Sequence, residues 1–431
     1  MTRTTDADTM KPTRRLDARA RRAGLSVATA AVAVLVLAAC GSDKKTTAAS
    51  GSSAASQPAK TGGSAGPTIQ VDNRSKDLNF ESISYFPDKA TVAAGTTLTF
   101  HSNFQGEPHT VSFGSGVDKA LKIFDGLTDE QKNGPPPPEV AALKIPFVIP
   151  DDADFSDPAS VKFNQSAAQP CIVAAGGFAP GAEPCPKPVA APFDGTQSFY
   201  NSGLLKDDAT FEVPLADDLA PGSYSWICLF HGPEMRGTLT VVAKDDKTAQ
   251  SADDVKAAGQ TLLDDAVAKI KPELDKANAD AKSGEVKAGI GIDQQPFGAV
   301  QFAPKEVSIP VGGKVTWNLS FHTVAFNASE DAHPDVIQDS DGTWHFNAKS
   351  FTPVGFTPPA PPADTGPPAS DAGPPPAMNV DGGTFDGSSF YNSGSIDSQG
   401  DVLFTITFSK AGTYKYLCLI HPDMEGTVKV G

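Results

Sequence analysis

Histidine, cysteine and methionine are scarce in this chain of 431 residues, which contains seven, five and five of them. So few histidines exclude sites that need many imidazoles, and no His-x-His pair occurs. The sequence also contains no Ser/His/Asp motif, no glycine-rich phosphate loop and no zinc-deaminase pattern. The enzyme classes that depend on those motifs are therefore not expected.

Basic residues are outnumbered, with 35 Lys and Arg against 51 Asp and Glu, which gives a net charge of −16. Residues 1–39 hold seven of the basic residues and three of the acidic ones, so the remainder carries 28 against 48, a net charge of −20. This acidity argues against nucleic acid or an anionic membrane surface as a partner. The length predicts two folded domains.

The first forty residues have the pattern of a bacterial export signal. A cluster of arginines precedes the uncharged stretch 23–39, which has the length of a signal-peptide core and is short for a membrane span. The ending LAAC at 37–40 resembles the lipobox of bacterial lipoproteins. We expect a signal peptide over 1–39, a lipid on Cys40 and a flexible Ser/Gly/Ala/Thr-rich tether over 40–67. An uncleaved anchor helix is the alternative, and both place the domains outside the cytoplasm.

Two long segments of the chain repeat each other. The first contains PHTVSF (108–113), FDGTQSFYNSG (193–203) and GSYSWICLFHGPEMRGTLTVV (222–242). The second contains FHTVAF (321–326), FDGSSFYNSG (385–394) and GTYKYLCLIHPDMEGTVKV (412–430). Since the order and much of the spacing are kept, the sequence predicts a duplicated domain, over 68–243 and 287–431.

Each copy has the pattern of β-structure. Apolar residues alternate at Val315, Trp317 and Leu319, and the same period of two precedes each late cysteine, at Tyr224, Trp226 and Cys228 and at Tyr414, Tyr416 and Cys418. Short strands with Gly and Pro turns are typical of a β-sandwich. Each copy carries a long insertion after its HTV strand, and the second insertion has ten prolines from Pro353 to Pro376.

Residues 244–286, which lie between the copies, have the pattern of a helix and not of β-strands. Apolar positions step by three and four, as on an amphipathic helix, at Val255, Ala258, Leu262, Ala266, Ile270 and Leu274. Ser251 with Asp254 offers an N-cap, and Pro272 is expected to kink or split the helix. We expect an all-β protein of two sandwiches joined by this helical linker, whose stripe serves packing.

Each copy repeats one cysteine, two histidines and one methionine: His109, Cys228, His231 and Met235 in the first, and His322, Cys418, His421 and Met424 in the second. A thiolate, two imidazoles and a weak axial thioether form the ligand set of a blue copper electron-transfer site. The cysteine closes a strand, the histidine lies in the next turn and the methionine begins the return strand, so three ligands converge from one loop. The upstream histidine ties that loop to the rest of the sandwich.

The segments G-x-Y-x-[WY]-x-C-x2-H, Met-x-Gly-Thr and H-T-V resemble those of the plastocyanin/azurin family of cupredoxins, over most of both copies outside the insertions. The resemblance implies two Greek-key sandwiches that each hold one type 1 copper through the four residues above. It implies that the loop histidine, His231 or His421, is the exposed edge through which electrons pass. Thr110 and Thr323 are expected to join the ligand strands by hydrogen bonds.

One loop departs from the pattern of the other. The first copy has three residues between its loop histidine and methionine, where the second has two. The tighter loop resembles the amicyanin type, so the axial role is better supported for Met424 than for Met235.

The two remaining cysteines, Cys171 and Cys185, both lie in the first insertion. In an exported protein they are expected to form a disulfide, whose 15-residue loop is worth roughly 3 kcal/mol against the unfolded chain. A pair of free thiols is the alternative. His101, His333 and His345 have no counterpart in the other copy and are expected to be surface or loop residues.

Copper nitrite reductases and two-domain laccases also contain two cupredoxin domains, but they need further coppers on additional histidines. Three unassigned histidines without a His-x-His pair do not supply these sites, and each loop has one cysteine where the binuclear centre of cytochrome oxidase needs two. We therefore expect no enzyme.

The function that remains is that of a lipid-anchored carrier of single electrons at the cell surface or in the periplasm. It would hold two copper ions and exchange electrons with a partner such as a cytochrome c or a membrane oxidoreductase. Copper sequestration or delivery is the alternative, although five methionines are few for a storage protein. A binding module built on the Pro-rich insertions, with structural copper, is a third hypothesis.

Overall fold

The computed structural model describes residues 66–431 apart from 76–77, 103–107, 129–130, 132–137, 144, 151–152, 154–159, 176–190, 206–207, 293–294, 320, 360–376, 397–400 and 422. The expected signal peptide, Cys40, nearly all of the tether, Cys185 and most of the Pro-rich run therefore lie outside the described residues. None of the described helices is long and apolar enough to cross a membrane.

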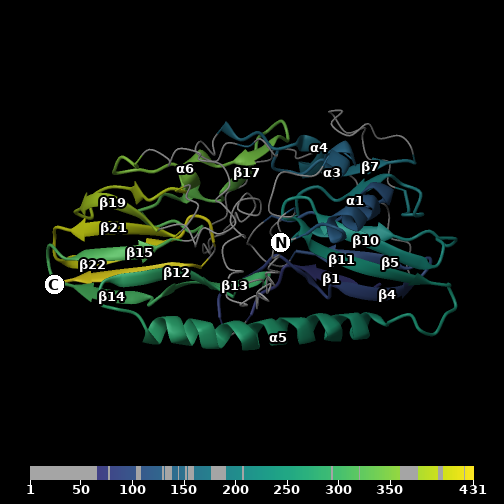
Figure 1. Cartoon of the computed structure of the whole chain (residues 1–431), viewed down its shortest axis with the longest axis horizontal. Helices are drawn as coiled ribbons and strands as arrows, with labels where there is room; N and C mark the ends of the chain where they lie inside the picture. Colours follow the sequence, from purple (N-terminus) through teal and green to yellow (C-terminus); the bar gives the residue numbers. More distant parts are fainter. Residues whose placement is uncertain are drawn as a thin grey trace, which may run out of the picture.

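The described chain is mostly β-structure with few helices (Figure 1). We call residues 66–242 the N-terminal half. Its strands are β1 (Thr68–Val71), β2 (Phe80–Ser82), β3 (Tyr85–Phe86), β4 (Lys89–Ala93), β5 (Thr97–His101), β6 (Ser112–Phe113), β7 (Cys171–Val173), β8 (Phe199–Asn201), β9 (Thr210–Pro214), β10 (Gly222–Cys228) and β11 (Gly232–Val242). Its helices are α1 (Ser115–Asp125), α3 (Pro138–Leu143) and α4 (Gln165–Ala168).

Helix α5 (Ala252–Ala279) leads into residues 285–431, which we call the C-terminal half. Its strands are β12 (Glu285–Gly291), β13 (Phe297–Ala303), β14 (Glu306–Ile309), β15 (Lys314–Asn318), β16 (Ala325–Phe326), β17 (Val336–Gln338), β18 (Trp344–Phe346), β19 (Met378–Phe385), β20 (Tyr391–Asn392), β21 (Val402–Phe408), β22 (Gly412–Leu417) and β23 (Glu425–Val430). A 3-10 turn, η2 (Glu330–Ala332), and helix α6 (Ala348–Phe351) lie in its long insertion.

Four large sheets form the body of the protein. The N-terminal half contributes sheets with the strand orders β3-β1-β5-β9 and β4-β11-β10-β6-β8-β7. The C-terminal half contributes β14-β23-β22-β16-β20 and, together with one strand of the other half, β19-β21-β15-β12-β13-β2. Because β2 belongs to a sheet of the C-terminal half, the two halves share continuous backbone pairing.

The two halves have equivalent aromatic cores, but the tryptophan stands on a different strand in each half. In the N-terminal half Trp226 of β10 lies 5.4 Å from Phe100 of β5, ring centre to ring centre and edge-on. In the C-terminal half Trp317 stands on β15 and meets Tyr416 of β22 at 5.3 Å in the same edge-on geometry. All four rings are buried. Exchanging the tryptophan between facing strands keeps the total volume nearly constant, which a close-packed core requires.

The strand predictions based on alternation are confirmed. Trp226 and Cys228 on β10 are fully buried, as are Val315 and Trp317 on β15. Leu319, which follows β15, is also buried.

Helix α5 runs along one side of the molecule and packs against strands of both halves, β1 and β3 in one and β12 and β13 in the other (Figure 1). The predicted cap is confirmed, since Ser251 and Asp254 form a reciprocal capping box. Pro272 does not split the helix, which continues from Ala252 to Ala279. Packing of apolar residues on both sides of Pro272 offsets the one backbone hydrogen bond that proline cannot donate.

The predicted stripe of α5 is confirmed at four positions and wrong at two, Ala258 and Leu262. The buried positions are Val255, Gly259, Leu263, Ala266, Ile270 and Leu274, whereas Leu262 is 37% exposed. Gly259 replaces an apolar side chain because the helix lies directly on the backbone of β3. A Cβ atom at this position would lie 2.7 Å from the carbonyl oxygen of Phe86. Hydrophobic periodicity does not reveal such a contact, since glycine contributes no apolar side chain.

This close approach reverses the usual effect of replacing a helical glycine by alanine. In an exposed helix the change stabilises by about 1 kcal/mol. We expect Gly259→Ala to lower the free energy of unfolding by about 1–3 kcal/mol, the range for overpacking. Denaturant unfolding of this variant beside Lys256→Ala, an exposed position of the same helix, checks the result, and a stabilised Gly259→Ala protein would contradict it.

Candidate metal centres

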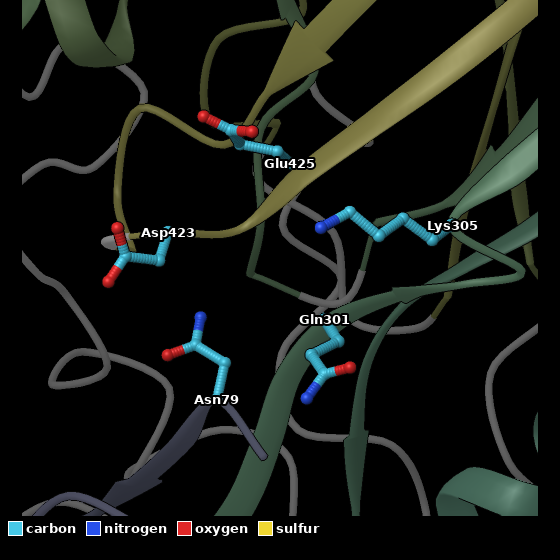
Figure 2. Close-up of a pocket in the computed structure, with 5 residues that line it drawn as sticks. All are labelled: Asn79, Gln301, Lys305, Asp423 and Glu425. Atoms are coloured by element: carbon cyan, nitrogen blue, oxygen red, sulfur yellow. The ribbon is translucent and has the colours of Figure 1, made fainter. Parts of the chain in front are cut away.

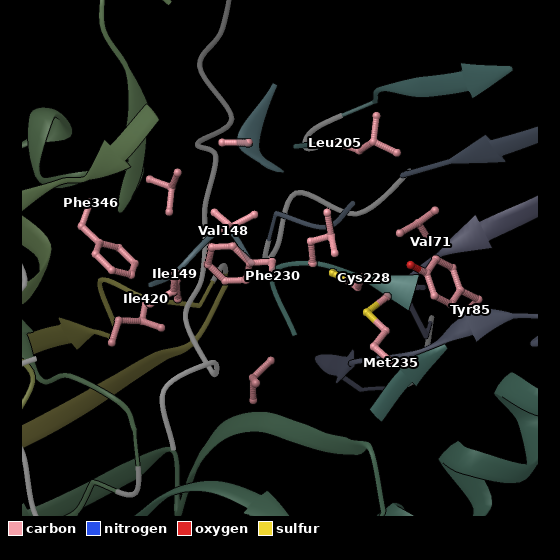
Figure 3. Close-up of a cluster of buried hydrophobic side chains, with 14 of the residues drawn as sticks. Val71, Tyr85, Val148, Ile149, Leu205, Cys228, Phe230, Met235, Phe346 and Ile420 are labelled. Carbon is pink, nitrogen blue, oxygen red and sulfur yellow. The ribbon is translucent and has the colours of Figure 1, made fainter. Parts of the chain in front are cut away.

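The first candidate metal centre brings together the donor atoms of His109, Cys228 and His231, all within 4.8 Å of one another. The two Nδ1 atoms are 3.1 Å apart, and Cys228 Sγ is 3.5 Å from Nδ1 of His231. All three residues are buried. Met235 is fully buried too, and Figure 3 shows its sulfur lying beside that of Cys228.

The second centre has the same composition in the C-terminal half, with His322, Cys418 and His421. The Nδ1 atoms of its histidines are 2.8 Å apart. Cys418 Sγ lies 3.6 Å from Nδ1 of His421 and 3.9 Å from Nδ1 of His322. Met424 is buried, and its carbonyl oxygen accepts a hydrogen bond of 2.9 Å from the amide of Cys418.

Each group is built from one strand connection and one distant segment. In the first, β10 ends at Cys228, the turn carries His231, and Met235 stands on β11. In the second, the cysteine, loop histidine and methionine all lie between β22 and β23. His109 is held by a two-way backbone pairing with Leu205, at 3.0 and 2.6 Å. The structure therefore brings together the repeated histidines and cysteines of each half, and the repeated methionines lie in the same strand connections.

The two predicted threonines join the ligand segments by hydrogen bonds, as expected. The Thr110 amide donates to Cys228 Sγ at 3.3 Å, and its hydroxyl accepts from the amide of Leu229 at 2.6 Å. Thr323 repeats both contacts with Cys418 and Leu419, at 3.4 and 2.7 Å. A thiolate that accepts amide hydrogen bonds is stabilised and fixed in direction.

The donor set fits a small thiophilic metal ion. Metal–ligand distances of about 2.0–2.3 Å place trigonal nitrogen and sulfur donors about 3.5–3.8 Å apart. The sulfur–nitrogen distances of 3.5 and 3.6 Å lie in this range. The nitrogen–nitrogen distances of 3.1 and 2.8 Å are shorter. Two histidines, a cysteine and a weak axial methionine are the donors that copper prefers in electron-transfer sites.

The surroundings of both thiols favour the form that binds metal. Burial raises the pKa of Cys228, but the charge of His231 and the hydrogen bonds of both histidines outweigh burial and hold the pKa well below its usual value. Burial also raises the pKa of Cys418, and the hydrogen bonds and charges of His322 and His421 again lower it well below the usual value. The thiolate is the species that ligates metal.

The expectation that the loop histidines are exposed is wrong. His231 is 7% exposed and His421 is 4% exposed. The residues before them, Phe230 and Ile420, belong to one buried cluster that also contains Phe346 of the C-terminal insertion (Figure 3). The N-terminal insertion covers the first loop as well, since the Val148 amide donates to the Leu229 carbonyl at 2.9 Å.

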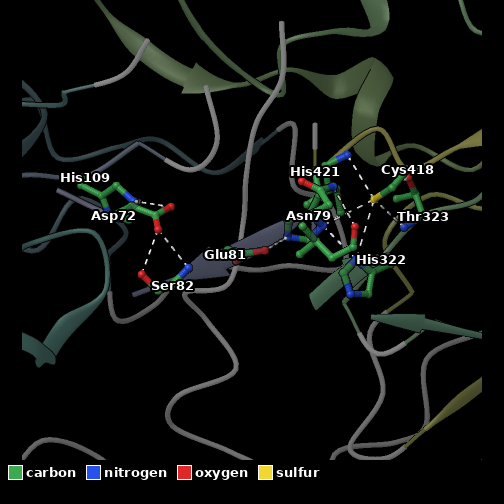
Figure 4. A network of polar contacts seen from close by, with 11 residues as sticks. Asp72, Asn79, Glu81, Ser82, His109, His322, Thr323, Cys418 and His421 are labelled. Atoms are coloured by element: carbon green, nitrogen blue, oxygen red, sulfur yellow. Dashed lines mark hydrogen bonds and ion pairs between the residues drawn. The ribbon is translucent and has the colours of Figure 1, made fainter. Parts of the chain in front are cut away.

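Two carboxylates, one buried and one partly exposed, contact histidines of the two groups, and the motifs had not singled out either of them (Figure 4). Asp72 Oδ2 lies 3.7 Å from Nε2 of His109, while its Oδ1 accepts from the amide and the hydroxyl of Ser82 at 3.0 and 2.9 Å. Glu81 Oε2 lies 3.0 Å from Nε2 of His421. Sequence reasoning missed both residues because neither is repeated between the copies.

These carboxylates give the histidines different proton affinities. Burial lowers the pKa of His421, but the charge of Glu81 and the hydrogen bonds of Cys418 and Glu81 raise it well above the usual value. Burial also lowers the pKa of His109, but the contacts with Asp72 and Cys228 together outweigh burial, and the pKa is raised. For His322 burial and the charge of His421 lower the pKa.

The three unrepeated histidines belong to neither group. His101 stands on β5 and His345 on β18, so they lie on strands and not in loops, and both are partly exposed beside aspartates, Asp208 at 2.7 Å and Asp339 at 3.2 Å. His333 is half-buried in the loop after η2.

The predicted disulfide between Cys171 and Cys185 stays a prediction, because Cys185 lies outside the described residues. Cys171 is buried at the start of β7.

A polar pocket of about 210 Å³ opens beside the second ligand loop (Figure 2). It is lined by Asn79 of the N-terminal half and by Gln301, Lys305, Asp423 and Glu425 of the C-terminal half. None of these side chains is a soft metal ligand, so the pocket is no further copper site.

No protein-family model matches the chain, and the search of curated proteins finds no match. Among solved structures, the chain is similar to reduced auracyanin of Roseiflexus castenholzii, with 16% identity over 42% of this chain and 99% of that one, at a TM-score of 0.19. It is also similar to a purple cupredoxin of Nitrosopumilus maritimus, with 14% identity over 41% and 99% of the two chains, at a TM-score of 0.17. An amicyanin matches with 13% identity over 42% and 84%, at a TM-score of 0.19. A TM-score this low does not establish a shared fold, so the motifs and the geometry of the two centres carry the interpretation.

Proposed function

We propose that this chain is an electron-transfer protein with two type 1 copper sites. The observation that carries the proposal is the pair of buried His–Cys–His groups, each with a buried methionine from the same strand connection as its cysteine. Copper bound there would supply one-electron chemistry by alternating between Cu(I) and Cu(II). We propose His109, Cys228, His231 and Met235 as ligands of one ion, and His322, Cys418, His421 and Met424 as ligands of the other.

The residues of the chain hold this donor set in one arrangement. Thr110 and Thr323 fix the thiolates by amide hydrogen bonds and fix the following residue of each loop through their hydroxyls. The buried apolar residues around the loops exclude water. A donor set that is held rigidly changes little when the charge of the metal changes, which keeps the reorganisation energy of electron transfer small.

The architecture that we propose is two Greek-key cupredoxin sandwiches joined by α5, with a long insertion in each. We also propose that Cys171 pairs with Cys185. The motifs, the register of the strands and the burial of Cys171 support these proposals. No catalytic activity is proposed.

The cellular setting is a proposal drawn from the N-terminal sequence. Cleavage after residue 39 and lipidation of Cys40 would anchor the mature protein to the outer face of a membrane. There it would exchange electrons with a redox protein such as a cytochrome c or a membrane oxidoreductase. The net charge of −20 beyond residue 39 is compatible with a basic partner.

Storage or delivery of copper is the competing function. A delivery protein has to release its metal, which is easier from exposed ligands. Here seven of the eight proposed ligands are at most 7% exposed, and His322 is 9% exposed. The burial of the donors therefore favours a carrier that keeps its copper.

Reconstitution with copper tests the proposal directly. We expect two copper ions per chain and an intense blue colour in the oxidised form, which arises from charge transfer between thiolate and Cu(II). Metal analysis and a visible spectrum after loading with Cu(II) are the measurements. A protein that binds no copper, or binds it without colour, would refute the proposed sites.

Single replacements test whether each group coordinates its own ion. We expect Cys418→Ser to remove one copper and about half of the blue absorbance, and Cys228→Ser to remove the other half, because cysteine provides the charge-transfer band. The reduction potentials of the two surviving sites should differ, since their histidines have different carboxylate contacts. Loss of both coppers in either variant would mean one shared site.

Replacement of Cys40 tests the anchor. We expect Cys40→Ala to release the protein from membranes or to block its maturation, with the copper sites unchanged. Membrane fractionation and labelling with a radioactive fatty acid are the measurements. Unchanged attachment, with the N-terminus cleaved elsewhere, contradicts the lipoprotein assignment.

A further inference from the structure

Strand β2 crosses from the N-terminal half into a sheet of the C-terminal half. It pairs antiparallel with β13, with Phe80 opposite Ala299, Glu81 opposite Gly298 and Ser82 opposite Phe297. Backbone hydrogen bonds extend the pairing at both ends, from Ile83 to Pro296 at 2.8 Å and from Val300 to Asn79 at 3.0 Å. The strand is therefore an integral part of the second sheet.

The register shows that Glu81 faces its own counterpart. Tyr85 pairs with Val71, and Phe302 pairs with Ala288 in the same way, so FESISYFP at 80–87 corresponds to FGAVQFAP at 297–304. Glu81 therefore corresponds to Gly298, the residue directly opposite it. The pairing is self-complementary, like the two-fold interface of a dimer.

This position makes the two metal centres unequal. Glu81 reaches across the junction, and its Oε2 lies 3.0 Å from Nε2 of His421. Its side chain is 15% exposed. Gly298 has no side chain that could reach the first centre.

Asp72, like Glu81, corresponds to a glycine in the C-terminal half. Ile69 lies opposite Phe100, and Val286 lies opposite Trp317 in the corresponding parallel pairing, so Asp72 corresponds to Gly289. Asp72 contacts Nε2 of His109. At Gly289 the imidazole of His322 takes this space, since a Cβ there would lie 1.9 Å from its Nε2.

We propose that Glu81 is a positioning residue of the second copper site, supplied by the N-terminal half. We also propose that the contacts of Asp72, Ser82 and Glu81 form a path along which one electron passes between the two sites. This inference rests on the proposed function. A carboxylate on Nε2 orients the ring and leaves Nδ1 to face the metal, as partners of ligating histidines do.

The path consists of contacts in the structure (Figure 4). His109 Nε2 meets Asp72 Oδ2 at 3.7 Å, and Asp72 Oδ1 accepts from the Ser82 amide at 3.0 Å. The peptide bond joins Ser82 to Glu81, whose carboxylate meets His421 at 3.0 Å. Covalent bonds and short polar contacts couple electron donors and acceptors better than gaps through space.

The exchange is balanced within the chain. Copper held at one site would be oxidised from Cu(I) to Cu(II) while copper held at the other would be reduced from Cu(II) to Cu(I), and no bond would form or break. Each site is thereby the first redox partner of the other.

Two variants distinguish the charge of Glu81 from its hydrogen bond: Glu81→Ala removes both, and Glu81→Gln removes only the charge. The control is Glu306→Gln, because Glu306 is exposed and pairs with Lys429. The first readout needs no copper. In the metal-free protein we expect the slowly exchanging Nε2 proton of His421 to be visible by NMR in the native and Gln forms and absent in Glu81→Ala. Its persistence in Glu81→Ala overturns the positioning role.

The second readout uses the copper-loaded protein. We expect the Cu(II) dissociation constant of the second site, measured in the Cys228→Ser background, to rise by about 10- to 100-fold in Glu81→Ala. The reduction potential of that site should rise in both variants, because a nearby negative charge favours Cu(II) over Cu(I). An unchanged dissociation constant and potential would overturn the positioning role.

Electron exchange is followed after a brief pulse of reductant that supplies less than one electron per chain. We expect a re-equilibration phase independent of protein concentration in the native protein, slower in Glu81→Ala, largely retained in Glu81→Gln and absent in Cys228→Ser. Native-like exchange in Glu81→Ala, with both coppers bound, overturns the path and leaves the proposed function intact. Failure of the native protein to bind copper refutes the proposed function and the path together, while the NMR signal still decides the position of His421.

Discussion

The pairing of β2 with β13 is the constraint on which the arrangement of the two halves depends. Antiparallel pairing fixes both the register and the direction of two strands. Here Glu81 faces its own counterpart, and Phe80 and Ser82 each face the counterpart of the other. Phe80 and Phe297 correspond to each other and stack at 5.9 Å. This pairing joins the two halves, and the loop histidines His231 and His421 are buried and not on the outer surface.

The long insertions complete the enclosure that this pairing begins. Gln165 of α4 exchanges hydrogen bonds of 3.0 Å with the backbone of Trp344 in both directions. Phe163 packs edge-on against Phe346 at 4.7 Å and lies 6.0 Å from Phe230, which precedes a ligand histidine. The described parts of the two insertions thus contact each other and the first ligand loop.

The sequence predicts the two groups of histidine and cysteine because their residues are repeated, and it misses the two carboxylates because they are not repeated. A residue that appears at corresponding positions of both copies is unlikely to do so by chance, which singles out His109 and His322 together with their loops. Asp72 and Glu81 fail this test, since their counterparts are Gly289 and Gly298. The burial of the loops was unpredictable for another reason: the residues that cover them are far away in the chain, and no local pattern encodes that contact.

Asp72 and Glu81 of the N-terminal half correspond to glycines in the C-terminal half. The two halves therefore differ in whether each one contains the carboxylate that contacts its own histidine. Burial of a carboxylate costs free energy, and a nearby positive charge offsets that cost. Asp72 is buried within the half that contains His109, so that half carries the partner of its own upstream ligand. Glu81 comes from the same half but serves His421 of the other one. The C-terminal half therefore has all four proposed ligands and lacks the charge that orients one of them. The two His–Cys–His groups have the same composition, and the crossing strand links the second of them to the N-terminal half.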